Sequence, residues 1–230
     1  MKTQLESTTY RQGHYHGIAA EPICRNKGDP VKQPLVKIRQ DHPAYPTRLG
    51  SEGPLLYARG NLSLLGKRQI GVFSSVRASG RAILRAIAWA RSMSGTGFAV
   101  ISGFHSPLEQ ECLPILMGNH VPVIVCAARE IEAYRVPPSW GEAIDAGMLL
   151  LLSSSVQSRR ITKRSSLARN ELVAALADEV VVLHAEGGQQ YGAARARARI
   201  AQQGCASPIA GDTDQTQHAR RVILYIVAEI

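Results

Sequence analysis

Short, uninterrupted apolar segments alternate with longer amphipathic segments through most of this chain, and that alternation constrains the fold more than any other feature. The apolar segments predict strands at Ile70–Phe73, Phe98–Ile101, Val121–Val125, Met148–Leu152 and Val180–Leu183. The amphipathic segments predict helices at Ser79–Ser94, Ser106–Met117, Ser166–Ala177 and Gln190–Gln203. Apolar strands separated by helices indicate a mainly parallel sheet with helices on both faces. We therefore predict a Rossmann-like, doubly wound α/β domain that binds its ligands outside the carboxyl ends of the strands.

This pattern occupies the middle of the chain, and the two ends differ from it. Residues 1–40 are polar and lack sustained periodicity, so we expect an N-terminal extension, partly disordered, before a domain at 41–205. In the C-terminal tail, 206–230, the apolar segment Val222–Ile230 fits either an edge strand or a docked helix. The polar start has no signal-peptide core, and the longest apolar run, Met148–Leu152, is too short to span a bilayer. We expect a cytoplasmic protein that makes no membrane contact.

The chain is strongly basic. Its formal net charge is +9 and its pI is about 9.7, which favours polyanionic partners such as nucleic acid or nucleotides, although a merely solvated basic surface has the same composition. The four cysteines, Cys24, Cys112, Cys126 and Cys205, are far apart and form no C-x-x-C pair. That spacing argues against a zinc ribbon and a disulfide scaffold, and it favours reduced, buried thiols.

The loop after the first predicted strand has the composition of an anion site. It reads S-S-V-R-A-S-G and contains Ser74, Ser75, Arg77, Ser79 and Gly80. Exposed amides at the start of the next helix favour a phosphate, and Arg77 adds a planar fork that suits phosphate oxygens. The alternative is that Ser79 caps the helix and Arg77 is solvated. The loop is not G-x-G-x-x-G and lacks the acidic ribose partner, so NAD binding is disfavoured.

The loop after the second strand, S-G-F-H-S-P-L-E, combines a turn with a helix start. Ser106, the proline after it and Glu109 form a capping-box pattern, which argues against Glu109 as a general acid. Ser102 and Gly103 precede this pattern, and the glycine permits a ligand to approach the backbone closely. His105 lies at the mouth of the sheet, where it is either a ligand contact or an ordinary loop histidine.

A dense basic cluster precedes the helix after the fourth strand. It contains Arg164, and a solvated basic loop is the usual explanation of such a cluster. Arg169 differs from the others because it falls in the middle of the apolar stripe of the helix. A buried arginine is costly unless it meets an anion, so we predict that Arg169 points across the strand ends to the ligand, next to Asn170.

The loop after the fifth strand, H-A-E-G-G-Q-Q, contains a second turn that permits close approach. Gly187 and Gly188 suit a phosphate or a ribose, and Glu186 can accept a hydrogen bond from a sugar hydroxyl. No other His, Cys or carboxylate stands at metal-binding spacing from His184. We therefore predict neither a metal site nor a bound cofactor.

With these motifs in view, the chain resembles the DNA-processing protein A (DprA/Smf) family from about His42 to Gly204. The similar segments, in order, are Y-P-T-R-L, L-Y-A-R-G-N-L, V-F-S-S-V-R-A-S-G, V-I-S-G, R-N and L-A-D-E-V-V-V-L-H-A. The resemblance implies a Rossmann-like domain that binds single-stranded DNA, forms homodimers and helps to hand the strand to a recombinase. It places the family's site residues at Ser75, Arg77, Ser79, Arg169 and Asn170.

The sequence departs from the family pattern in two respects. The family's S-G-x-A-x-G-I-D loop is replaced by S-G-F-H-S-P-L-E at Ser102–Glu109, so we expect a changed ligand contact there. No winged-helix or helix-hairpin pattern flanks the core. DNA binding is therefore an expectation that rests on kinship and charge.

The same superfamily includes the LOG-type phosphoribohydrolases, which supply the alternatives. Asn170 stands where their helix has lysine, and the glycine loop lacks their glutamate, so no carboxylate is evident to activate water. We predict a non-catalytic, DprA-like protein that binds single-stranded DNA at the strand ends and acts in DNA processing or recombination. The alternatives are a nucleotide-binding or sensing domain and, less favoured, a nucleoside-monophosphate phosphoribohydrolase.

Overall fold

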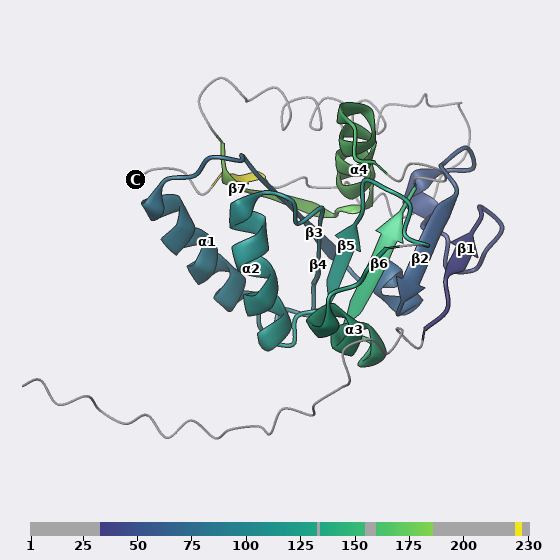
Figure 1. Ribbon diagram of the computed structural model, residues 1–230, viewed down its shortest axis with the longest axis horizontal. Coiled ribbons are helices and arrows are strands. Elements are labelled where there is room, and N and C mark those ends of the chain that lie inside the picture. Colours follow the sequence, from purple (N-terminus) through teal and green to yellow (C-terminus); the bar gives the residue numbers. More distant parts are fainter. Residues whose placement is uncertain (1–32, 133, 155–159, 186–223, 227–230) are drawn as a thin grey trace, which may run out of the picture. The chain divides into compact units, whose positions relative to one another are not determined.

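The computed structural model describes residues 33–132, 134–154, 160–185 and 224–226. These residues form an eight-stranded sheet with the order β1-β2-β6-β5-β4-β3-β7-β8 (Figure 1). The strands are β1 Val36–Ile38, β2 Leu56–Gly60, β3 Gln69–Ser74, β4 Ala99–Ser102, β5 Val123–Cys126, β6 Leu149–Ser153, β7 Glu179–His184 and β8 Leu224–Ile226. No helix in this described part of the chain is long and apolar enough to cross a membrane.

The strand directions confirm the predicted class. The strands from β6 across to β8 run parallel to one another, whereas β2 pairs antiparallel with β6 and β1 antiparallel with β2. The strand order reverses at β3, because β4, β5 and β6 follow on one side of it and β7 pairs on the other. In doubly wound sheets, ligands bind at such a reversal, outside the carboxyl ends of the strands.

Helices cover both faces of the sheet (Figure 1). The helices α1 (Gly80–Ser92), α2 (Pro107–Gly118) and α3 (Pro138–Asp145) pack in one core cluster. The helix α4 (Lys163–Leu176) packs in the other cluster, together with the short 3-10 helices η1 (Thr47–Leu49) and η2 (Leu62–Gly66). A three-layer α/β architecture follows, with the sheet in the middle.

Adjacent residues of the central strands point into opposite core clusters. On β6, Leu149 and Leu151 belong to the cluster under α1, α2 and α3, whereas Leu150 and Leu152 belong to the cluster under α4. All four leucines are 0% exposed. Burying a side chain of this size contributes about 1.5–3 kcal/mol, so successive positions of the central strands are apolar and polar alternation is absent.

Capping hydroxyls decide where the helices begin. Ser79 and Ser106 cap α1 and α2, because each hydroxyl accepts a hydrogen bond of 3.3 Å from the amide three residues on. The helix α4 begins at Lys163, three residues before the predicted start, because Thr162 and Ser165 form a reciprocal capping box. A serine in place of the usual Glu or Gln at the third position hid this signal from the sequence pattern.

The strand β1 and the helix α3 were not predicted, and β8 is one of the two alternatives left open for the C-terminal segment. The strand β1 lies inside 1–40, the range expected to be an extension, and its Ile38 is 0% exposed in the core. The helix α3 lies between β5 and β6, where no helix was predicted. The strand β8 makes part of Val222–Ile230 an edge strand, parallel to β7. The predicted helix at Gln190–Gln203 lies outside the described residues.

The Y-P-T-R-L segment ties the amino ends of two strands to α4. Arg48 Nη1 donates to the carbonyl of Leu176 and to Asp178 Oδ2, the latter at 3.1 Å. The same carboxylate oxygen accepts a hydrogen bond of 2.7 Å from the amide of Gln69. These contacts lie at the starts of β3 and β7, at the opposite edge from the carboxyl ends. This family-like motif therefore stabilises the fold.

Candidate nucleic-acid interface

Four elements meet at the carboxyl edge of the sheet, where the strand order reverses. The loop after β3 contacts β7, because the amide of Ser75 donates to the carbonyl of His184 at 2.9 Å. The β3–β7 register shifts just before this contact, between Phe73 and Ser74, as bulges often do beside functional sites. The loop after β4 contacts α4, whose Arg169 packs on Gly103. Most of the predicted site residues are thus brought to one edge.

Glu109, in the first turn of α2, joins two of these loops from inside the protein. It is 0% exposed, and its Oε1 accepts a hydrogen bond from the amide of Ser74 at 2.9 Å. Its Oε2 accepts from the amide of His105 at 3.0 Å and from the hydroxyl of Ser102 at 3.2 Å. The predicted cap by Ser106 is confirmed, but the carboxylate serves the neighbouring loops instead of returning to the Ser106 amide.

The surroundings of Glu109 keep it ionised. Burial by itself raises the pKa of a carboxyl group, but the contacts with His105 and Ser106 outweigh burial and lower the pKa of Glu109. The imidazole Nδ1 of His105 lies 3.2 Å from Oε2. An ionised carboxylate whose oxygens are already occupied organises the loops, and it does not supply a proton to a substrate.

Arg169 is buried, as its place on the apolar face of the helix predicts, and only 4% of it is exposed. Its Nε and Nη2 donate to Asn170 Oδ1 at 3.0 and 2.8 Å, and Nη2 lies 3.3 Å from Nε2 of His105. Within the described part of the chain, no hydrogen bond engages Nη1. Burial lowers the pKa of Arg169 and nearby Glu109 opposes that effect, but an arginine stays charged.

The loop after β4 is shaped to admit the Arg169 side chain. A Cβ atom on Gly103 would lie 2.6 Å from Arg169 Nε and 2.8 Å from its Cζ, so any other residue there would force the guanidinium to move. The next residue, Phe104, has a φ of 44°, in the left-handed region that costs a non-glycine residue about 1–2 kcal/mol. Its buried ring and its amide, which donates to Ser102 Oγ at 3.2 Å, hold the turn in place.

The serine-rich loop after β3 lies beside this arrangement. Ser74 and Ser75 are half-buried, whereas Arg77, Ser79 and Gly80 are exposed at the start of α1. The cap by Ser79 satisfies one amide of α1, and the other amides of the first turn face the carboxyl edge. The loop therefore presents hydroxyl, amide and guanidinium donors, which is the chemistry that phosphate oxygens accept.

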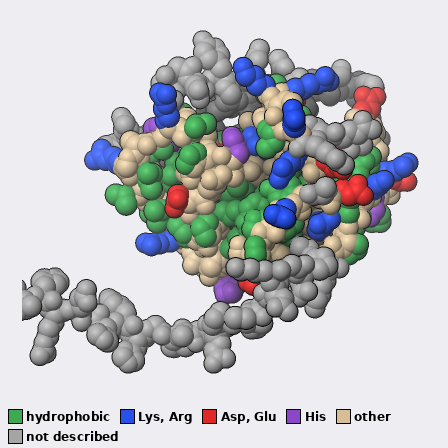
Figure 2. Space-filling view, in the orientation of Figure 1, with side chains coloured by type: hydrophobic (Ala, Val, Ile, Leu, Met, Phe, Trp, Pro, Cys, Tyr) green, Lys and Arg blue, Asp and Glu red, His purple; other side chains and the backbone are tan. Residues whose placement is uncertain are grey.

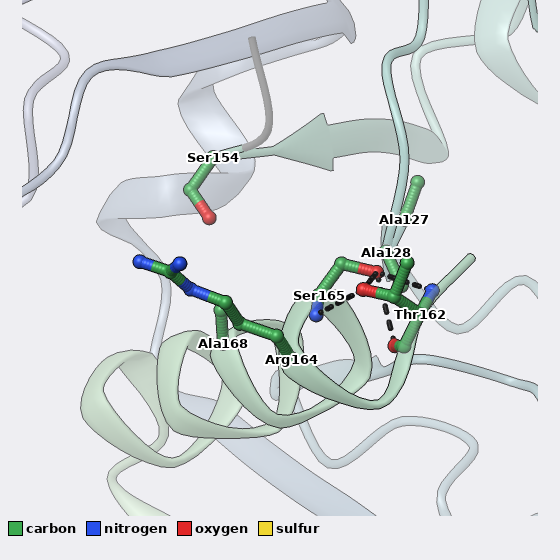
Figure 3. A pocket seen from close by; sticks show the side chains of 7 residues that line it. All are labelled: Ala127, Ala128, Ser154, Thr162, Arg164, Ser165 and Ala168. Atoms are coloured by element: carbon green, nitrogen blue, oxygen red, sulfur yellow. Dashed lines mark hydrogen bonds between the residues drawn. The ribbon is translucent and has the colours of Figure 1, made fainter. Parts of the chain in front are cut away.

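Arg164 stands apart from Arg169. It lines an open pocket of about 330 Å³ at the ends of β5 and β6 and the start of α4 (Figure 3), together with Ala127, Ala128, Ser154, Thr162, Ser165 and Ala168. In Figure 3, Arg164 extends from α4 towards Ser154. Figure 2 shows further Lys and Arg side chains over the α4 side of the molecule. The basic character of this edge thus extends beyond the Arg169 contacts.

The remaining candidate residues give no sign of acid, thiol or metal chemistry. Burial raises the pKa values of Cys112 and Cys126 to about 12, so both thiols stay protonated at neutral pH. In the described ranges, no three His, Cys, Asp or Glu side chains are grouped to hold a metal ion. The predicted site residues Glu186, Gly187 and Gly188 lie outside the described residues.

The solved structures that share the fold of this chain include two DNA processing proteins. DNA processing protein A (DprA) from Streptococcus pneumoniae is 22% identical with a TM-score of 0.60, and the match covers 75% of this chain and 61% of that chain. DNA processing protein A from Helicobacter pylori, whose structure is described with a unique single-stranded DNA binding mode, is 21% identical with a TM-score of 0.56. That match covers 74% of this chain and 78% of the other. The chain thus spans about three fifths of the pneumococcal structure.

The sequence itself gives the family assignment. None of the curated proteins compared with this chain matches it significantly. The profile of the family described as DNA recombination-mediator protein A matches residues 35–218, which is most of the chain and includes each element of the carboxyl edge described above. The chain therefore belongs to the DNA recombination-mediator protein A family.

Proposed function

We propose that this protein binds single-stranded DNA along the carboxyl edge of its sheet, as a step in DNA processing or recombination. The observation that carries the proposal is the buried guanidinium of Arg169, held at that edge between Gly103, His105 and Asn170. The family membership and the single-stranded DNA named for the Helicobacter pylori structure support the same ligand. No catalytic step is part of the proposal.

The polar groups at this edge are arranged for an anion. Desolvating a guanidinium is costly, and the amide oxygen of Asn170 meets only two of its donors. A phosphate at the edge would accept from Nη1 of Arg169 and from the side-chain NH2 of Asn170, whose oxygen already accepts from the arginine. We infer that Arg77 and the first-turn amides of α1 also donate to this phosphate, from the loop after β3.

A polyanionic ligand accounts for the positive charge of this protein better than a single phosphate does. The net charge is +9, and the edge continues from Arg169 to the basic start of α4, where Lys163 and Arg164 are exposed. A strand that crosses several of these groups would release counterions, so its affinity should fall as salt rises. Aromatic residues make up only 5% of the chain, so we expect backbone contacts to dominate over base stacking.

Fluorescence anisotropy with labelled oligonucleotides of increasing length tests the proposal. We expect affinity to rise with length and to fall at least tenfold in the Arg77→Ala/Arg169→Ala variant, because each hydrogen bond to a charged group contributes about 1.5–3 kcal/mol. The control Lys67→Ala/Arg91→Ala removes the same charge from exposed positions at the opposite edge. Equal losses in both variants would mean that the charge acts only through the general field.

The pocket at the start of α4 favours one other function, the binding of a single nucleotide. Its volume of about 330 Å³ and its lining of small, hydroxyl and guanidinium groups suit a nucleotide-sized ligand. In that case a mononucleotide would displace the oligonucleotide, and affinity would not grow with length. A phosphoribohydrolase is supported less, because the carboxylate beside Arg169, Glu109, is fully buried and already hydrogen-bonded.

The proposal includes the partners and the setting that the family resemblance implies. A homodimer would double the length of basic edge available to one strand, and a recombinase would take over the bound strand. A cytoplasmic location and a place in the wider superfamily with the LOG-type proteins belong to the same proposal. Sedimentation of the full chain with and without an oligonucleotide would separate a dimer from a monomer that DNA bridges.

A further inference from the structure

We infer that His105 is a positioning residue of this edge, which holds the Arg169 guanidinium through Nε2 while Glu109 fixes the imidazole through Nδ1. The consequence for DNA affinity rests on the proposed function. The arrangement itself is testable without any ligand.

The neighbours of the two ring nitrogens determine which of them carries the proton of the neutral imidazole. Nδ1 of His105 lies 3.2 Å from the Glu109 carboxylate, and Nε2 lies 3.3 Å from Nη2 of Arg169. Glu109 is ionised and offers no proton, whereas Nη2 of Arg169 is always a donor. The neutral tautomer that satisfies both neighbours carries its proton on Nδ1 and accepts at Nε2. The two flanking charges thus select one tautomer.

His105 makes the contact that links Arg169 to a different element. The other hydrogen bonds of the guanidinium go to Asn170, its neighbour on α4, and they do not fix α4 against the loop after β4. His105 belongs to that loop, and its own amide is bonded to Glu109 at 3.0 Å. The contact with His105 holds the guanidinium of Arg169 against Gly103. It thereby fixes the direction of the guanidinium N–H groups that a phosphate would contact.

The charges around the imidazole favour the Nδ1–H tautomer. Among the described residues, the charged and titratable groups that face His105 or Arg169 are Glu109 from α2 and Cys126 from β5, and the Cys126 thiol is protonated. Of these two groups only Glu109 carries a negative charge, and it faces Nδ1. The tautomer with its proton on Nε2 would direct that proton at Nη2–H of Arg169, so only the Nδ1–H tautomer keeps the contact.

Two substitutions separate the roles of the two ring nitrogens. In His105→Gln the amide reaches the place of Nε2 and can still accept from Arg169, whereas in His105→Asn it reaches only the place of Nδ1. We expect His105→Gln to keep oligonucleotide affinity within about twofold, and His105→Asn and His105→Ala to lose about tenfold, the value of one hydrogen bond to a charged group. His120→Asn, at an exposed position with a left-handed φ of 56°, is the histidine control.

Nitrogen-15 NMR of the ligand-free protein provides the readout that does not depend on DNA. We expect an Nδ1–H tautomer for His105 and an exchange-protected Nε–H signal for Arg169, which broadens in His105→Ala but not in His105→Gln. An Nε2–H tautomer, or an unchanged Arg169 signal in His105→Ala, would overturn the inference. If the NMR results hold but Arg169→Ala leaves oligonucleotide affinity unchanged, the proposed DNA site is wrong and the positioning role stands.

Discussion

Replacing Glu109 with glutamine should destabilise the whole carboxyl edge while preserving its shape. The amide can keep its oxygen at the place of Oε2, where the His105 amide and the Ser102 hydroxyl donate. Its NH2 group then faces the amide of Ser74, and two donors oppose each other inside the protein. An orphaned buried donor costs about 1–3 kcal/mol, and the other two hydrogen bonds lose their charge assistance.

The sum is a loss of about 3 kcal/mol in the free energy of unfolding, or a fall of about 6–12 °C in Tm for a chain of this size. Urea unfolding followed by circular dichroism measures it. Glu111→Gln, an exposed neighbour on the same helix, serves as the control and should change stability by less than about 0.5 kcal/mol.

The pH dependence gives a second check on the same variant. The pKa of Glu109 is lowered in the folded state, so its ionisation contributes stability that is fully present above its ordinary value of 4.5 and is lost as pH falls through the folded pKa. The difference between wild type and Glu109→Gln should therefore shrink in acid. A variant as stable as the wild type, or a difference that does not change with pH, would refute the role given to this carboxylate.

Three further predictions concern Gly103, the cap of α1 and the two buried cysteines. Gly103→Ala should lower oligonucleotide affinity at least tenfold in anisotropy. The new Cβ would lie only 2.6 Å from Nε of Arg169, so the guanidinium would have to leave its place. Ser79→Ala should cost about 1 kcal/mol in urea unfolding, since it removes the cap of α1; no loss would show that water replaces the hydroxyl. Cys112 and Cys126 should not react with iodoacetamide at pH 8 until the protein unfolds, given their pKa values of about 12. Mass spectrometry of the labelled peptides would reveal any earlier reaction.

The central strands and Arg169 could be predicted because their signals are local. A run such as Leu149–Leu152 is apolar at every position only if both faces of the strand are buried, and the structure confirms this. Arg169 breaks an otherwise apolar helix face, and a charge placed there predicts both burial and a special partner. Each inference needs only the periodicity of one segment.

The contacts that organise the edge could not be predicted, because they join segments that are distant in the sequence. Glu109 fits a capping pattern with Ser106, and nothing in the sequence indicates that its carboxylate bonds to Ser74, 35 residues away. The contact between His105 and Arg169 spans 64 residues. The strand β1 was missed for a related reason, since three residues beside a polar stretch carry too little pattern and are stabilised by pairing with β2.

The salt dependence of single-stranded DNA binding tests the proposed interface most directly. For a single strand, log K falls against log salt with a slope of about −0.7 for each phosphate contact. Removing Arg77 and Arg169 together should make the slope shallower by about 1.4 and weaken binding, whereas removing Lys67 and Arg91 should leave the slope unchanged. A slope that is the same in all three proteins would contradict a phosphate-binding role for the carboxyl edge, whatever the overall affinity.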